Sequence, residues 1–265
     1  MEEKALTAKK SGFSMLLLCL IVFASGAALF VYAIGHLERG ENALGGFLLV
    51  VTILGYIAGF IALAGFKVLK PQEALVLTLF GQYAGTLREP GFYWVCPFCT
   101  AVNPAAGTKL SQSGDVDGGA KAAAQAQAQP SSKKISLKMM TLNNSRQKIN
   151  DCLGNPVEIG IAVIWRVTDT AKAVFNVDNY KEYLSLQCDS ALRNVVRIYP
   201  YDVAPNVDTT GDGVADEGSL RGSSEIVAKR IQDEIQSKVA DAGIEIVEAR
   251  ITYLAYAPEI AAVML

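Results

Sequence analysis

The chain has 265 residues, of which 51% are apolar and 19% are charged, a balance more apolar than that of an ordinary soluble domain. Its 24 basic and 26 acidic residues give a net charge of −2, which excludes nucleic-acid binding through phosphate contacts. The single histidine, His36, excludes a Ser-His-Asp triad, a Cys-His dyad and an HExxH zinc site. Five scattered cysteines are too few for the disulfide framework of a secreted domain. The composition therefore predicts a membrane protein with a modest globular part.

The apolar excess is concentrated in two stretches near the start of the chain. Residues 13–34 and 43–66 contain no charged side chain. Because roughly 20 helical residues cross a hydrocarbon core about 30 Å thick, each stretch is long enough to span a membrane. A signal peptide has a shorter apolar core, about 7–15 residues, and no second span close behind it. We therefore predict a cytoplasmic tail over residues 1–12 and a transmembrane helical hairpin over residues 13–66.

The charges that flank the hairpin predict its orientation. The only lysine or arginine in the connecting loop is Arg39. Outside the hairpin, lysines lie on both sides: Lys4, Lys9, Lys10, Lys67 and Lys70. The positive-inside rule therefore places both termini in the cytoplasm. Within the second span, Gly55 and Gly59 form a GxxxG pattern, which allows a neighbouring helix to approach closely.

From residue 67 the composition becomes that of an α+β domain, which we expect to cover residues 67–257. Alternating and β-branched runs predict strands, and 3.6-residue periodicity predicts helices. The expected strands are 73–80, 92–95, 135–142, 147–152, 157–167 and 244–254. Helices are expected over 180–198 and from Ser223 or Ser224 to Ala242, with Glu225–Lys229 and Glu234–Lys238 pairs on the exposed face of the second helix.

Three segments are predicted to be irregular or terminal. Residues 82–91 are predicted to form a turn-rich connection. Residues 103–132 form a low-complexity insertion rich in Ala and Gln, and residues 201–218 form a polar loop. Pro258 is expected to begin a last helix over residues 258–265.

Several motifs in order give the chain a family resemblance. Val68 to Tyr83 contains a Pro, a Glu and an apolar strand that ends in Phe-Gly, and a Pro-Gly, an aromatic residue and a Pro-Phe follow. The residues that carry the pattern are Pro71, Glu73, Phe80, Gly81, Pro90, Gly91, Pro97, Trp165, Arg166 and Pro258. The chain from Val68 onward resembles the SPFH, or Band 7, family of stomatins, prohibitins, flotillins and the bacterial modulators of a membrane-anchored AAA protease.

The resemblance implies a non-enzymatic scaffold without a cofactor. Its partners would be membrane lipid, further copies of itself in a large ring- or cage-like homo-oligomer, and a client such as a membrane protease or an NfeD-type protein. It would organise a membrane microdomain at the cytoplasmic face of a bacterial inner membrane. In that family a long helix or coiled coil drives assembly. This sequence stops where that helix would start, as a truncated chain would, or as a member without the assembly element would.

The motif Cys96-Pro97-Phe98-Cys99 offers an alternative from another functional class. A CxxC with an internal Pro and aromatic residue resembles the active site of glutaredoxin, so the chain could be a membrane-tethered thiol oxidoreductase. That chemistry expects the motif at a helix N-terminus, whereas here it follows a predicted strand. A zinc site would need Cys152 and Cys188 as further ligands, and Cys188 lies on an apolar helix stripe typical of a buried core thiol.

An acidic loop resembles a calcium-binding loop. Asp208, Asp212 and Asp216 fall at positions 1, 5 and 9 of an EF-type loop, with Gly213 at position 6. Position 12 is Ser219, where a bidentate Glu is needed. The pattern therefore favours a solvated acidic loop over a metal site.

Overall fold

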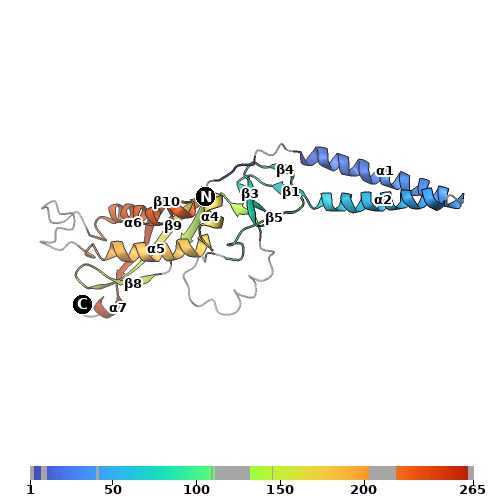
Figure 1. Cartoon of the computed structure of the whole chain (residues 1–265). Coiled ribbons are helices and arrows are strands. Elements are labelled where there is room, and N and C mark those ends of the chain that lie inside the picture. The colour runs from blue at the N-terminus through green and yellow to red at the C-terminus, as the bar shows by residue number, and fades with distance from the viewer. Residues whose placement is uncertain are drawn as a thin grey trace. The chain divides into compact units, whose positions relative to one another are not determined.

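The computed structural model in Figure 1 describes residues 3–6, 11–39, 42–108, 110, 132–144, 146–202 and 219–261. The three aspartates of the possible calcium loop lie outside these residues, as do most of residues 103–132 and 201–218. The chain forms two compact units: an N-terminal unit, Lys4–Val102, and a C-terminal unit, which comprises Met1–Glu3 and Asn103–Leu265.

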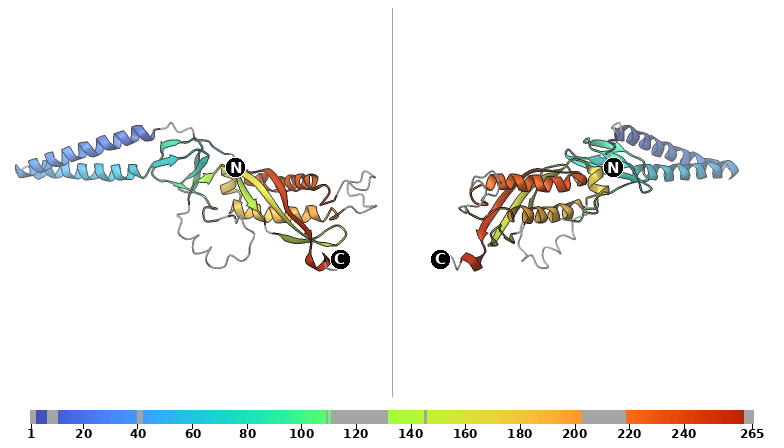
Figure 2. Two further views of the ribbon diagram at one scale, coloured as in Figure 1. Left: turned by 180° about the vertical axis from the view of Figure 1, so that it is seen from behind. Right: turned by 60° about the vertical axis from the view of Figure 1, so that its left-hand side comes forward.

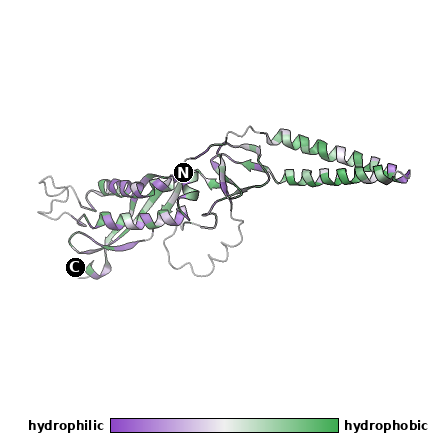
Figure 3. Ribbon diagram, viewed as in Figure 1, coloured by the Kyte–Doolittle hydropathy of each residue, from purple (hydrophilic) through white to green (hydrophobic). Residues whose placement is uncertain are grey.

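The N-terminal unit begins with two long helices packed as an antiparallel hairpin. Helix α1 covers Gly12–Glu38 and helix α2 covers Asn42–Leu63. The connection is shorter than the sequence predicts, because α1 continues past His36 to Glu38. The second apolar stretch is not helical to its end, since α2 stops at Leu63 and Phe66 already belongs to a strand. Both helices are coloured as hydrophobic along nearly their whole length in Figure 3.

The strands of the N-terminal unit form two small antiparallel sheets. They are β1 (Phe66–Leu69), β2 (Glu73–Leu79), β3 (Gln82–Leu87), β4 (Gly91–Trp94) and β5 (Cys99–Ala101). Strand β1 pairs with β4, and β2 lies between β3 and β5. Their common core consists of Leu69, Leu75, Leu77, Leu87, Tyr93 and Val95. The prediction of a turn-rich connection over residues 82–91 is wrong for its first half, because Phe80 and Gly81 take φ values of 49° and 84° and turn the chain directly into β3.

The C-terminal unit is a sheet covered by helices on one face. The sheet consists of β7 (Met140–Asn143), β8 (Gln147–Asn150), β9 (Pro156–Val167) and β10 (Ile244–Tyr256), and the two-residue strand β6 (Ile135–Ser136) is not part of it. The helices of the unit are α4 (Thr170–Phe175), α5 (Tyr180–Val196), α6 (Ser224–Val239), the 3-10 turn η1 (Ala240–Ala242) and α7 (Pro258–Ala261). Strand β9 is central, with β10 antiparallel along one side and β7 and β8 along the other.

Alternation along β9 explains why the helices lie where they do. Every second residue from Val157 to Val167 is buried, and α5 and α6 lie side by side over that face of the sheet (Figures 1 and 2). The buried stripe of α6 is Val227, Ile231, Ile235 and Val239, as its periodicity predicts. Of the two predicted ion pairs on α6, Lys238–Glu234 forms at 3.1 Å, but Lys229 pairs with Asp233 at 3.0 Å instead of with Glu225.

The first residues of the predicted insertion belong to the folded C-terminal unit. Ala105 is fully buried. The Nζ of Lys181 on α5 donates to the carbonyl oxygens of Ala105 and Thr108, at 3.1 and 2.6 Å, and Asn179 donates to the Thr108 hydroxyl. Burial lowers the pKa of Lys181. Residues 103–108, the first of the predicted insertion, are therefore fixed to the start of α5.

Candidate functional site

The helical hairpin presents an apolar surface that needs a non-aqueous environment. In the most apolar window of each helix only 11% of the residues are buried, whereas a core helix of a soluble protein would be mostly buried. Phe13, Val31, Phe47 and Phe60 are each more than 60% exposed. An apolar surface of this extent marks contact with lipid or with another protein. Both helices are long and apolar enough to cross a membrane.

The two helices pack against each other through aromatic rings, one of which lies against a glycine. The ring of Phe23 lies 5.7 Å from that of Tyr56 and 5.4 Å from that of Phe60. A Cβ added at Gly59 would lie 2.9 Å from the Phe23 ring, so glycine leaves the space for that ring. A Cβ at Gly55 would meet nothing within 4 Å. Within the hairpin, only Gly59 of the predicted GxxxG pair makes a close helix contact.

The strands of the N-terminal unit are joined to the end of the second helix by hydrogen bonds. The indole Nε1 of Trp94 donates to the carbonyl oxygen of Ala62 at 2.9 Å, and Val95 N donates to Gly65 O at 3.0 Å. The Nζ of Lys67 donates to the carbonyl oxygen of Ala64. These bonds satisfy carbonyl groups that a helix C-terminus leaves open. Strand β1 therefore starts, and strand β4 ends, directly at the end of α2.

Two exposed phenylalanines stand on turns at the same end of these strands. Phe80, on the turn between β2 and β3, is 85% exposed, and Phe98, just before β5, is 59% exposed. Their rings stack with centroids 6.3 Å apart. Phe98 follows Val95, which is bonded to the end of α2, by only three residues. We call Phe80 and Phe98 the aromatic tip; it lies at the helix-proximal end of the strands.

The Cys96–Cys99 motif lies in a turn next to this tip and lacks the features of a redox site. Cys99 N donates to Cys96 O at 2.9 Å, so the motif is a turn that leads into β5 and not the start of a helix. Burial and the neighbouring Cys96 raise the pKa of the Cys99 thiol. The low thiol pKa of a disulfide exchange catalyst belongs to the first cysteine of the motif and is favoured by a helix N-terminus, which this turn does not provide. The geometry gives the oxidoreductase alternative no support.

The other cysteines do not join this pair. Cys152 is exposed near the start of the turn before β9, and Cys188 is fully buried on α5. Burial raises the pKa of Cys188 to about 12, which keeps it a neutral core thiol. Among the described residues, no three His, Cys, Asp or Glu side chains are grouped so that they could hold a metal ion.

The motif residues that carry the family resemblance have structural roles. Pro71 lies in the turn between β1 and β2, where the carboxylate of Glu73 accepts a bond from Lys70 N. Trp165 is fully buried on β9, where its ring meets that of Tyr180 edge-on. The guanidinium of Arg166 binds both carboxylate oxygens of Glu245 across the β9–β10 pair, at 2.8 and 3.1 Å. Pro258 begins α7.

Asp151 is a further key residue, which the sequence alone does not single out. Asp151 is only 5% exposed, and its carboxylate accepts bonds from the backbone N–H groups of Leu153, Asn155 and Tyr201, at 2.9, 2.7 and 3.2 Å. It therefore fixes the turn before β9 and the chain that follows α5. The only sequence signal is an Asp placed before a Gly-Asn-Pro turn, which is typical of side-chain bonding to turn amides.

Comparison with known proteins identifies the family. The model of the SPFH domain / Band 7 family matches residues 67–264, most of the chain. The chain therefore belongs to the SPFH, or Band 7, family, whose members are generally membrane-associated scaffolds that oligomerise. No curated protein matches the chain.

Proposed function

We propose that this chain is a membrane-anchored scaffold whose copies assemble laterally into a ring- or cage-like homo-oligomer. The assembly would organise a membrane microdomain and its resident proteins, for example a membrane protease or an NfeD-type protein. The observation that carries the proposal is the direct succession of an apolar helical hairpin, which ends at Leu63, and a Band 7 match that begins at residue 67. In this proposal the chain catalyses no reaction.

Lateral assembly explains how subunits whose orientation a short hairpin fixes only weakly give a stable structure. In a closed ring each subunit uses the same two surfaces, and contacts that are individually weak add up because every subunit is held on both sides. The hairpin restricts all copies to one plane, which raises their effective concentration. We further propose the division into a tail (1–12), a hairpin (13–66), an SPFH domain (67–257) and a terminal helix (258–265).

The aromatic tip supports a second contact with the membrane. Phe80 and Phe98 expose their rings at the helix-proximal end of the strands, and Trp94 holds β4 against the end of α2. Aromatic side chains are enriched at the level of the lipid headgroups, where a span leaves the membrane. In our proposal the tip rests in this layer and fixes the tilt of the strands on the membrane surface.

The mass of the extracted full-length gene product tests the assembly. Light scattering on protein in detergent or polymer particles is expected to give a large, discrete homo-oligomer. A monomer or dimer would contradict the scaffold proposal.

The proposed placement in a bacterial inner membrane, with both termini cytoplasmic, has a separate test. An Arg39→Cys variant is expected to react with an impermeant maleimide in intact cells, because Arg39 lies in the loop between the helices. The exposed Cys96 and Cys152 should react only after permeabilisation, and they serve as the internal control. Reaction of Cys152 in intact cells would reverse the proposed orientation.

A further inference from the structure

One row of side chains on α6 covers part of the outer edge of β10. Gln236 and Gln232 stand one helical turn apart, and their amides bond to the strand as a neighbouring strand would. Gln236 donates to Ile244 O and accepts from Ile246 N, at 3.1 and 2.7 Å. Gln232 donates to the carbonyl oxygens of Ile246 and Val247, at 3.1 and 3.0 Å. These two side chains therefore close the edge from Ile244 to Val247.

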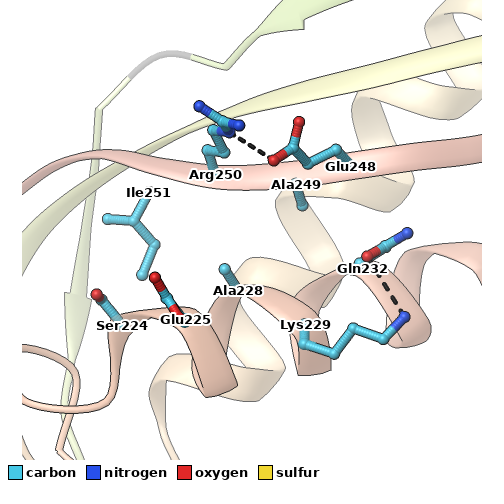
Figure 4. A pocket seen from close by; sticks show the side chains of 9 residues that line it. All are labelled: Ser224, Glu225, Ala228, Lys229, Gln232, Glu248, Ala249, Arg250 and Ile251. Atoms are coloured by element: carbon cyan, nitrogen blue, oxygen red, sulfur yellow. Dashed lines mark hydrogen bonds and ion pairs between the residues drawn. The ribbon is translucent and has the colours of Figure 1, made fainter.

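The same row continues toward the start of α6 with residues too short to reach the strand. Positions four residues apart share one helix face, so the row runs from Gln236 and Gln232 to Ala228 and Ser224. Where the glutamines end, a groove of about 510 Å³ opens between α6 and β10. Figure 4 shows Ala228 on the helix with Ala249 and Ile251 directed toward it from the strand.

The backbone of β10 offers hydrogen bonds at this groove. In an antiparallel pair, two opposite residues either bond to each other or both direct their N–H and C=O groups away. Ile161 of β9 stands opposite Ile251, and its carbonyl oxygen accepts from Asn144 N on the far side of β9. The polar backbone groups of Ile251 therefore point to the outer edge of β10. Those of Ala249, two residues earlier and opposite Val163, point the same way.

The rim of the groove is charged, but most of its charges are already paired. Arg250 Nε lies 2.6 Å from a carboxylate oxygen of Glu248, and Lys229 Nζ lies 3.0 Å from one of Asp233 (the first pair is drawn in Figure 4). A charged small ligand would have to break these pairs. A peptide backbone would not, because it needs only the edge amides and the apolar floor.

We propose that this groove binds an extended, uncharged segment of a client polypeptide, which adds to β10 as a new edge strand. The backbone of the segment bonds to Ala249 and Ile251, and one of its apolar side chains fills the space above Ala228. Such strand addition takes affinity from main-chain bonds and specificity from alternate side chains. The proposal rests on the proposed function, since the client is a protein that the scaffold recruits.

The occupied start of the edge argues for a client segment over a second copy of β10. Two copies paired along the full strand would both need the edge at Ile244–Val247, which Gln232 and Gln236 already fill. The straight run of edge between Val247 and the register shift that follows Ile251 is short, and that length suits a single extended segment.

The test uses a substitution that continues the glutamine row. Ala228→Gln places a third amide one turn before Gln232, where it closes the groove while keeping a good helix former. The matched control is Ser237→Gln, which adds the same side chain to α6 outside the groove. Short linear peptides displayed on phage are selected against the full-length protein in lipid nanodiscs. The selected peptides are then synthesised and titrated by fluorescence anisotropy.

We expect selected peptides whose affinity falls at least tenfold, or about 1.4 kcal/mol, in Ala228→Gln and is unchanged in Ser237→Gln. N-methylation of alternate peptide amides should abolish binding, while methylation of the intervening ones should not. Equal binding to wild-type and Ala228→Gln protein, the absence of any selected binder, or uniform tolerance of N-methylation would overturn the proposal. A loss of oligomer mass in Ala228→Gln without loss of peptide binding would assign the edge to a second copy. The mass of the wild-type protein tests the scaffold proposal separately.

Discussion

Replacing Phe80 and Phe98 by serine should detach the strands of the N-terminal unit from the bilayer without unfolding them. Both rings are mostly exposed, at 85% and 59%, and neither belongs to the core around Leu77 and Tyr93. Their rings stack on each other, with centroids 6.3 Å apart. The double substitution therefore removes surface that only the membrane would bury.

The magnitude follows from the exposed fractions. Complete burial of a Phe side chain is worth about 1.5–3 kcal/mol relative to exposure. Scaled by exposures of 85% and 59%, the two rings together contribute about 3 kcal/mol when lipid covers them. A change of this size shifts the ratio of membrane-resting to detached strands by on the order of a hundredfold.

The assay measures how close position 96, next to the aromatic tip, lies to the lipids. Cys96 is exposed and lies two residues before Phe98, so a protein with Cys96 as its only cysteine can carry an environment-sensitive fluorophore there. In vesicles that contain spin-labelled lipids we expect quenching for the parent protein and its loss in the Phe80→Ser/Phe98→Ser variant. Leu186→Ser, which alters a side chain 65% exposed on α5, is the matched control and should leave quenching unchanged. Equal quenching in parent and double variant would refute the reasoning.

Three further substitutions test how the C-terminal unit is held together. Asp151→Ala leaves buried amide donors, including Asn155 N, without their acceptor and should lower the free energy of unfolding by about 3 kcal/mol, measured with denaturant; a loss below about 1 kcal/mol would contradict this. The Cys188 thiol has a pKa of about 12 in the fold against an ordinary 9.0. The contribution of this neutral thiol to the free energy of unfolding is therefore complete below pH 9, and it falls by about 1.4 kcal/mol per pH unit as the pH rises toward 12. Cys188→Ala should therefore flatten the loss of stability at alkaline pH, and an unchanged profile would contradict the assignment. Gly243→Ala should cost more than about 2 kcal/mol in thermal or denaturant unfolding, because Gly243 has φ +65° and a Cβ would collide with the carbonyl oxygen of Asp169; full stability of this variant would contradict the backbone argument.

Long periodic segments of the fold could be predicted from the sequence, whereas short elements could not. The buried stripe of α6 and the long strand β9 follow from their spacing of apolar residues. Strand β3 was missed because Gln82–Leu87 is polar at its start and contains Gly85, so only its pairing with β2 makes it a strand. Helix α4 was missed because six residues carry little periodicity. It is stabilised by the cap of Asp169, which accepts from Lys172 N, and by burial of four of its residues.

The binding features depend on non-local geometry, which explains why the sequence did not predict them. In the sequence, Phe80 and Phe98 are recognisable only as parts of a family motif. The pairing of Leu79 with Cys99 is what brings their turns together. The i,i+4 row on α6 is visible in the sequence, but its meaning depends on β10 lying alongside with an unpaired edge. Conversely, Cys96 and Cys99 form a conspicuous motif in the sequence, but the turn that holds them leads into β5 and does not begin a helix, so the structure gives the redox alternative no support.

The conspicuous polar groups of the C-terminal unit are occupied in maintaining its fold, and this bears on the kind of function to expect. Asp151 is saturated by backbone amides, and Asp189 accepts short bonds from Asn144 and Gln147. Lys181 is bonded to two carbonyl groups. In the described parts of the chain, an exposed pair of aromatic rings and an open strand edge face outward. Both are suited to binding a surface or an extended chain, which the proposed scaffold function requires.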